Sequence, residues 1–145
     1  MKEQAIRELK LLEVRRMAAD SLRLRRRVLE ADALGLADRD ERTAATSQAW
    51  LCGRCDRLQQ QEALLREQVT QTERVLASMP SRQRTVLEAL YVHPRQNPIR
   101  WLQDTLYVSR TQVYRIREEA LTRFSLLLGL DLVPGEAVQE DKSAV

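Results

Sequence analysis

Glycine and proline are scarce in this 145-residue chain, which contains four of each. An all-β fold needs many tight turns, and these two residues are the ones that make such turns. Their scarcity, and the abundance of good helix formers such as leucine, alanine, arginine and glutamate, predict an all-α fold. Aromatic residues make up only 4% of the chain, so we expect an aliphatic core and no aromatic stacking surface for single-stranded nucleic acid.

Long apolar runs are missing as well. No segment approaches the roughly 20 apolar residues of a membrane span. None resembles the apolar core of a signal peptide, about 7 to 15 residues long. We therefore expect a cytoplasmic protein with no membrane partner.

Cysteine and histidine are too few for most metal or disulfide frameworks. The only cysteines, Cys52 and Cys55, have the spacing of half a zinc site, and the single histidine, His93, is remote in sequence. We expect two reduced cysteines near a helix seam and no metal or cofactor, although a four-thiolate site shared across a dimer stays open.

The sequence also lacks the patterns of an enzyme. It contains no phosphate-binding loop, no paired-carboxylate site and no nucleophile spaced from a base as in a catalytic motif. His93 is expected at a helix end, and Glu118 and Glu119 are expected to be solvated. We predict that the protein is not an enzyme and has no catalytic residues.

Charge is distributed unevenly along the chain. Residues 1–30 hold nine basic and five acidic residues, and residues 78–128 hold eight and four. The intervening residues 31–77 and the last residues, 129–145, are net acidic. Two basic blocks permit contact with a polyanion, although basic surface also serves solubility alone.

Two long helices are predicted over residues 2–33 and 47–78, joined by a polar loop that begins at Gly35. Residues 1–78 are therefore expected to form an antiparallel, coiled-coil-like helical hairpin. Pairing between chains, in addition or instead, would give a homodimer, because a narrow seam leaves apolar surface uncovered. The arginines between positions 15 and 27 fit a solvated flank, a second DNA contact or a partner-binding face. The apolar stripe of the first helix is Val14, Met17, Ser21, Leu24 and Val28, widened by Leu11, Ala18 and Leu22, and the seam of the second is Leu51, Cys55, Leu58, Glu62, Leu65, Val69, Thr72 and Leu76.

Three shorter helices are predicted in residues 79–129. The first begins with Ser81 as its N-cap and ends before Pro94, the second covers 99–106, and the third runs from 110 to 127 and is closed by Gly129. Residues 130–145 are expected to be a disordered acidic tail.

The last two of these helices, with the three-residue turn between them, have the pattern of a helix-turn-helix. Ser109 is expected to cap the second helix by accepting a bond from the backbone amide of Thr111 or Gln112. Packing would then leave polar side chains of the first two turns free to contact base edges and phosphates. The expected packing residues are Val108, Val113 and Ile116 on Leu102 and Leu106, and the expected free residues are Arg110, Thr111, Gln112, Tyr114 and Arg115.

This region resembles the fourth region of bacterial sigma factors. The resemblance lies in "MPSRQRTVLEALYV" followed by "WLQDTLYVSRTQVYRIREEALTRF", about 45 of the 145 residues. With the long helices in front, the chain is similar to small sigma-like regulators of phages and prophages of Gram-positive bacteria, several of which activate late genes. The resemblance implies a DNA-facing set of Ser109, Arg110, Thr111, Gln112, Tyr114 and Arg115, and a packing set of Val108, Val113, Ile116, Ala120 and Leu121.

Two positions depart from the family pattern. Gln103 stands where a small residue is usual, and Tyr107 stands in the turn where glycine, which accepts a positive φ cheaply, is usual. Either the turn geometry differs, or Tyr107 is strained and held by packing.

The sequence therefore predicts a sequence-specific regulator that binds double-stranded DNA. The resemblance implies a regulator of phage or prophage type that activates late genes. Two other readings stay open, a small terminase-like DNA-packaging subunit and an adaptor that binds RNA polymerase. Neither the DNA target, the direction of regulation nor the oligomeric state follows from the sequence. Further phosphate contacts or a general positive field are expected from Arg84, Arg95, Arg100, Arg117 and Arg123, of which Arg100 and Arg117 join the predicted DNA-binding set.

Overall fold

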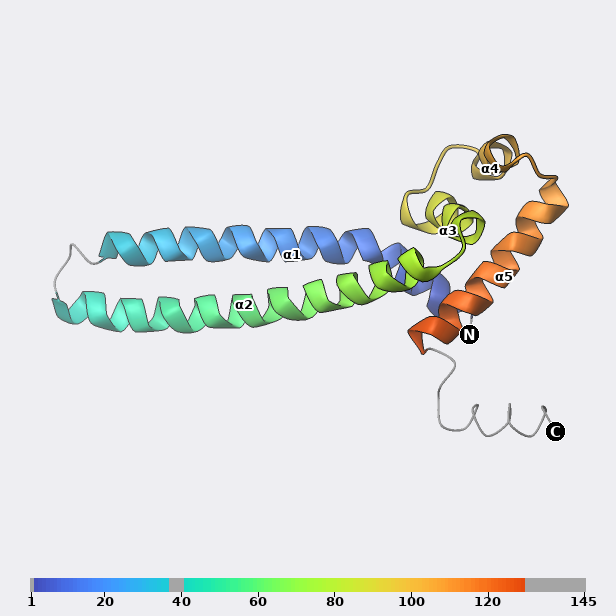
Figure 1. Ribbon diagram of the computed structural model, residues 1–145. Coiled ribbons are helices and arrows are strands. Elements are labelled where there is room, and N and C mark those ends of the chain that lie inside the picture. Colours follow the sequence, from blue (N-terminus) through green and yellow to red (C-terminus); the bar gives the residue numbers. More distant parts are fainter. Residues whose placement is uncertain (1, 37–40, 130–145) are drawn as a thin grey trace, which may run out of the picture. The chain divides into compact units, whose positions relative to one another are not determined.

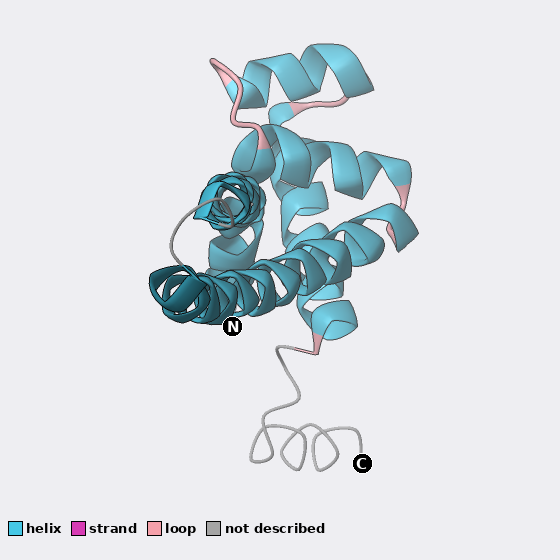
Figure 2. Ribbon diagram, turned by 90° about the vertical axis from the view of Figure 1, so that its left-hand side faces the viewer, coloured by secondary structure: helices cyan, strands magenta, loops and turns pink. Residues whose placement is uncertain are grey.

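The computed structural model describes residues 2–36 and 41–129, and these residues form helices and connecting turns only, as predicted (Figures 1 and 2). Within this described part, no helix is long and apolar enough to cross a membrane. The predicted acidic tail, residues 130–145, lies outside it. The elements are α1 (Lys2–Leu36), α2 (Glu41–Ser78), α3 (Ser81–Leu87), the π-helical segment η1 (Glu88–Val92), α4 (Pro98–Leu106) and α5 (Arg110–Leu128).

The chain divides into two compact units. Among the described residues, one comprises the start of α1, to Glu13, and residues 70–129, while the other comprises Val14–Val69. The second unit consists of long stretches of α1 and α2, and the first contains the shorter helices and the candidate site.

Polar contacts join α1 to α2 within Val14–Val69. The guanidinium of Arg66 donates to Asp20 at 3.1 Å and to Glu62 at 2.9 Å, and Arg26 lies 3.2 Å from Glu62. Nearer the other end, the side-chain amide of Gln48 donates to the backbone oxygen of Ala33. In this series of contacts the α1 residues have increasing numbers while their α2 partners have decreasing numbers, so the two helices run in opposite directions here.

The predicted seam of α2 is the side of the helix that is covered. Leu51, Val69 and Leu76 are buried, and so are the two polar members, Glu62 and Thr72. Cys55, Leu58 and Leu65 are half-buried. The periodic pattern therefore identified the buried side of this helix correctly.

The prediction that the apolar stripe of α1 is its buried side was wrong. Val14, Met17, Leu24 and Val28 are between 58% and 68% exposed. The side of α1 that is covered instead carries Leu12 and Ala19, followed by the half-buried Leu22, Arg26 and Leu29. This covered side is itself largely apolar, and it also brings Arg26 to the buried carboxylate of Glu62.

The predicted loop between the long helices was too long. α1 continues through Gly35 to Leu36, and α2 begins at Glu41. Glycine inside a helix costs only about 1 kcal/mol relative to alanine, so it does not by itself end one. The start of α2 contains glutamate, arginine and alanine, all of which favour a helix.

The shorter helices enclose an aliphatic core. Val86, Leu102 and Val113 are fully buried, and Ala89 is nearly so. These residues come from α3, η1, α4 and α5, so one cluster holds all four segments together. Around this cluster pack the partly buried Leu90, Ile99, Trp101, Leu106, Val108 and Ile116.

Two local features at α3 differ from expectation. The N-cap is Pro80 without a side-chain bond, so the prediction of Ser81 as the cap was wrong. Ser81 is the first helical residue, and its carbonyl accepts a bond from the hydroxyl of Thr85 at 2.8 Å. The helix then widens into the π-helical turn of η1, which ends at Val92, before Pro94.

Candidate nucleic-acid interface

The start of α5 is fixed by a reciprocal cap. The Ser109 hydroxyl accepts a bond from the backbone amide of Gln112 at 3.2 Å, and the Gln112 side-chain oxygen accepts one from the Ser109 backbone amide at 2.8 Å. This capping box satisfies two amides that would otherwise lack partners at the helix start. The predicted cap at Ser109 is confirmed, with Gln112 as the donor.

The turn before α5 places Tyr107 in the left-handed region, with φ 55° and ψ 48°. Its ring does not hold it there, because the side chain is 92% exposed. The backbone does, since the amides of Tyr107 and Val108 both donate to the carbonyl of Gln103, the second at 3.3 Å. Of the two expected alternatives, Tyr107 takes the conformation that glycine usually takes, but packing of its own side chain plays no part.

The predicted packing positions of α5 are confirmed. Val113, Ala120 and Leu121 are buried, and Val108 and Ile116 pack against the cluster that contains Leu102. Burial of this side fixes the rotation of α5 and determines which residues face outward.

The predicted DNA-facing residues lie on the uncovered side of α5. Their common feature is position in the first two turns of a helix whose N-terminus carries a partial positive charge. Ser109, Arg110, Thr111, Gln112 and Arg115 are exposed, and Tyr114 is half-buried.

Gln112 is already engaged in this conformation. Its side-chain oxygen belongs to the capping box, so a bidentate contact to adenine would require that bond to open. The amide nitrogen of the same side chain is the group that can donate without disturbing the cap.

Tyr114 lies between two arginines of α5. The guanidinium carbon of Arg110 is 5.8 Å from the ring centroid and that of Arg117 is 5.2 Å away. Arg110 also approaches the Tyr114 hydroxyl at 3.5 Å. The ring thus orients both cations along one side of the helix.

Arg117 and Glu118 form a polar group at the middle of α5. Arg117 donates to Glu118 at 2.8 Å, and this bond raises the pKa of Arg117. Glu118 also pairs with Lys2, and the bonds from Lys2 and Arg117 lower its pKa. Glu118 is therefore solvated, as expected, but it is also an ion-pair partner, and part of the charge of Arg117 is neutralised.

An open hollow of about 620 Å³ lies between α4 and α5. Arg100 of α4 and Arg110 of α5 both line it, and Asp104 is its acidic member. Gln103 also lines it, so this position presents an amide to the hollow. Sequence reasoning did not assign Gln103 or Asn97 to the site; the clue was their proximity along the chain to Arg100. The complete lining is Asn97, Pro98, Ile99, Arg100, Gln103, Asp104 and Arg110.

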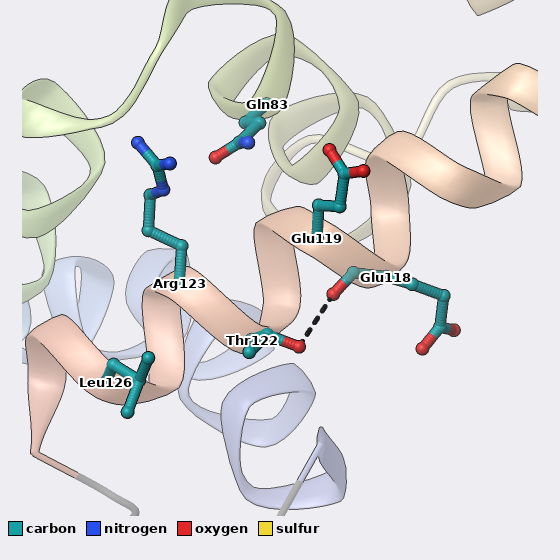
Figure 3. A pocket seen from close by; sticks show the side chains of 6 residues that line it. All are labelled: Gln83, Glu118, Glu119, Thr122, Arg123 and Leu126. Atoms are coloured by element: carbon teal, nitrogen blue, oxygen red, sulfur yellow. Dashed lines mark hydrogen bonds between the residues drawn. The ribbon is translucent and has the colours of Figure 1, made fainter. Parts of the chain in front are cut away.

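A second hollow, of about 480 Å³, has a mixed lining (Figure 3). Arg123, one of the predicted phosphate contacts, shares it with Glu118, Glu119 and Gln83. The Thr122 hydroxyl here donates to the Glu118 backbone oxygen at 3.0 Å. Two carboxylates beside one guanidinium give this hollow no preference for an anion.

Arg95, another predicted phosphate contact, lies over the ring of Trp101 with its guanidinium carbon 3.9 Å from the centroid. This stacking orients Arg95, which remains exposed, on the surface beside α4. Arg84, by contrast, is half-buried.

Cys52 and Cys55 lie on α2, away from the residues just described in sequence. Cys52 is exposed and Cys55 is half-buried, and burial raises the pKa of the Cys55 thiol. Among the residues that the structure describes, no group of three or more histidine, cysteine, aspartate or glutamate side chains is placed to hold a metal ion.

Comparisons with models of protein families, with curated proteins and with solved structures found no match to this chain.

Proposed function

We propose that this protein binds double-stranded DNA in a sequence-specific manner through a helix-turn-helix formed by α4, the turn at Tyr107 and α5. The observation that carries the proposal is the capped start of α5, whose packed side is buried while Arg110, Thr111 and Arg115 are exposed together. In this proposal α5 enters the major groove with its N-terminal turns.

In this proposal, different residues contact the bases and the phosphates. Arg115 and Arg110 have the side chain that makes bidentate contacts to guanine, and Thr111 suits a thymine methyl or a base-edge hydrogen bond. Arg100, across the hollow from α5, is the proposed phosphate contact, because it stands beside the N-terminal end of α4. Arg117 contributes less than its neighbours, since Glu118 already binds it.

The remainder of the proposal concerns the setting of this motif. We propose that the long helices form an antiparallel hairpin and that the chain is a sigma-like transcriptional regulator of phage or prophage type, an activator of late genes that acts with RNA polymerase. The hairpin is supported by the contacts of Asp20, Arg26 and Ala33 with residues of α2. The regulator is supported by the sequence resemblance in α3 to α5.

The test begins with selection of preferred duplexes from a random pool, followed by binding titrations of the full chain at several salt concentrations. Arg115→Ala is expected to weaken binding to the selected site by roughly 5- to 150-fold, equivalent to about 1–3 kcal/mol, and to relax preference at one base pair. Arg100→Ala should weaken all sequences alike and lower the salt slope by about one.

Arg82→Ala is the matched control, because Arg82 is an exposed arginine of α3 that does not line the α4–α5 hollow. Circular dichroism should show all three variants to be as helical as the unmodified chain. The proposal is refuted if the unmodified chain binds no duplex at low salt, or if Arg115→Ala and Arg82→Ala have the same effect on sequence preference.

A further inference from the structure

Four exposed apolar side chains lie along one side of α1. Val14, Met17, Leu24 and Val28 recur every three or four residues, with Ser21 at the centre, and the four apolar members are 58–68% exposed. We call these five residues the α1 stripe. Large exposed apolar patches rimmed by polar residues mark protein–protein contacts.

Residues of α2 extend this apolar surface. A hollow of about 580 Å³ lies beside the α1 stripe and is lined by Leu24, Val28, Trp50 and Leu58. Trp50 is 57% exposed, and the guanidinium carbon of Arg54 lies 5.3 Å from its ring centroid. A partner placed on the stripe would therefore also cover a tryptophan.

The α1 stripe is nearly symmetrical about its central residue. Val14 and Val28 stand seven positions on either side of Ser21. Lys10 and Asp32 stand eleven positions on either side, close to three helical turns, and both are exposed. One end of the stripe is thus followed by a cation and the other end by an anion.

We propose that the α1 stripe is the contact between two copies of this chain, with their α1 helices antiparallel and a twofold axis passing by Ser21. This orientation sets Val14 against Val28 of the second copy and Lys10 against Asp32 of the second copy. A parallel pair would instead set Lys10 beside Lys10 and Asp32 beside Asp32. Only the antiparallel pair satisfies both the apolar and the charged positions.

The short length of this contact points to a dimer of low affinity. The α1 stripe spans about 21 Å of helix. Stable interfaces bury about 1,200–2,000 Å² in total, and Trp50 beside the stripe adds to the apolar surface that a second copy would cover. The dimer therefore dissociates on dilution.

Sedimentation equilibrium of the full chain over a wide range of concentration tests the surface. The paired substitution Met17→Glu with Leu24→Glu is expected to weaken dimerisation by more than roughly a hundredfold, because it sets four carboxylates in the contact. Leu64→Glu is the control, since Leu64 is also 59% exposed but lies on α2 and does not line the hollow beside the stripe. All these side chains are exposed, so circular dichroism should show unchanged helix content.

Trp50 supplies a second readout. In a Trp101→Phe background it is the only tryptophan. Its emission is expected to shift to shorter wavelength as the concentration rises, and the paired stripe variant should abolish that shift.

Charge reversal tests the orientation. Lys10→Asp alone, or Asp32→Lys alone, creates two like-charge contacts in the antiparallel dimer and should weaken it by roughly 2- to 30-fold. The double variant restores opposite charges and should recover the original affinity. In a parallel dimer each of these residues faces its own copy. Combining the two reversals would then restore no affinity.

Cross-linking gives the register. In a chain with Cys52→Ser and Cys55→Ser, a mixture of Val14→Cys and Val28→Cys proteins should form a mixed disulfide dimer on oxidation. Neither protein alone should do so.

The proposal is overturned if the chain stays monomeric at every concentration, if the stripe variant and Leu64→Glu dimerise equally, or if Val14→Cys protein links to itself. It does not rest on DNA binding by α5, and none of these measurements includes DNA. A monomeric chain that still binds DNA would refute the dimer alone.

Discussion

The bundle of α3, η1, α4 and α5 and the two-helix unit Val14–Val69 bury different kinds of side chain. In the bundle, Val86, Leu102, Val113 and Phe124 are all 0% exposed. In the two-helix unit, the large aliphatic residues with the most burial are Leu51, at 6%, and Val69, at 8%. Glu62, a charged residue, is buried to the same degree, at 7%.

The difference follows from the number of helices. Several short helices can surround an aliphatic cluster, but two helices cover only one side of each other. The two-helix unit therefore leaves room for Arg26, Glu62 and Arg66 at its contact. A buried ion pair adds little net stability but is costly to break, so it selects one register and one rotation of α1.

The largest change in the free energy of unfolding is expected when side-chain volume is removed from the bundle. Leu102→Ala should lower the free energy of unfolding by about 2–5 kcal/mol, because it removes buried contacts and leaves a cavity at the centre of the cluster. Urea unfolding followed by circular dichroism measures this loss. Leu64→Ala, at a position that is 59% exposed on α2, is the control and should change the value by no more than about 0.5 kcal/mol. Equal losses for the two variants would mean that Leu102 is not at the centre of a packed core.

A smaller effect is expected from the charged contact of the two-helix unit. Glu62→Gln keeps the shape but removes the carboxylate that Arg26 and Arg66 share, and should destabilise the chain by about 1–3 kcal/mol. The same urea titration applies. Replacing Arg26 and Glu62 together by leucine should recover most of this loss, because no buried charge is then left alone and Arg66 keeps its bond to Asp20.

Glu67→Gln is the matched control for that pair of variants, since Glu67 is exposed on the same helix. If Glu67→Gln costs as much as Glu62→Gln, then general helix charge, rather than the contact with α1, explains the effect.

The two helices of this unit also show what periodicity can and cannot predict. On α2, the spacing of Leu51, Val69 and Leu76 identified the covered side, because the large aliphatic residues recur at helical spacing on that side and Leu64 on the other side stands alone. On α1, two sides compete. The stripe from Val14 to Val28 and the side with Ala19 and Arg26 are both largely apolar, and the side that is covered is the one whose Arg26 meets Glu62, 36 residues further along the chain.

Local chemistry was predicted better than long-range contact near α5. The cap at Ser109 and the closing Gly129 depend on residues only a few positions apart, so sequence was sufficient. The pairing of Glu118 with Lys2 and the hollow that joins Arg100 to Arg110 depend on tertiary structure. The π-helical turn of η1 left no signal in the apolar pattern.

The smallest expected effect concerns the turn that precedes α5. A non-glycine residue in the left-handed region costs about 1–2 kcal/mol, which glycine avoids. Glycine in turn loses about 0.5–1 kcal/mol of stability, because it has more conformational freedom in the unfolded chain. Tyr107→Gly should therefore stabilise the bundle by about 0.5 kcal/mol, since a ring that is 92% exposed contributes almost no burial. Thermal unfolding followed by circular dichroism is the measurement.

Tyr107→Ala separates backbone conformation from loss of the ring. Alanine keeps the Cβ atom that makes φ 55° costly, so this variant should show no gain, whereas glycine should. If alanine and glycine stabilise equally, the tyrosine ring itself is the unfavourable element. If glycine destabilises, the backbone bonds to Gln103 cannot by themselves hold the turn in the conformation that orients α5, and the exposed ring must contribute to it.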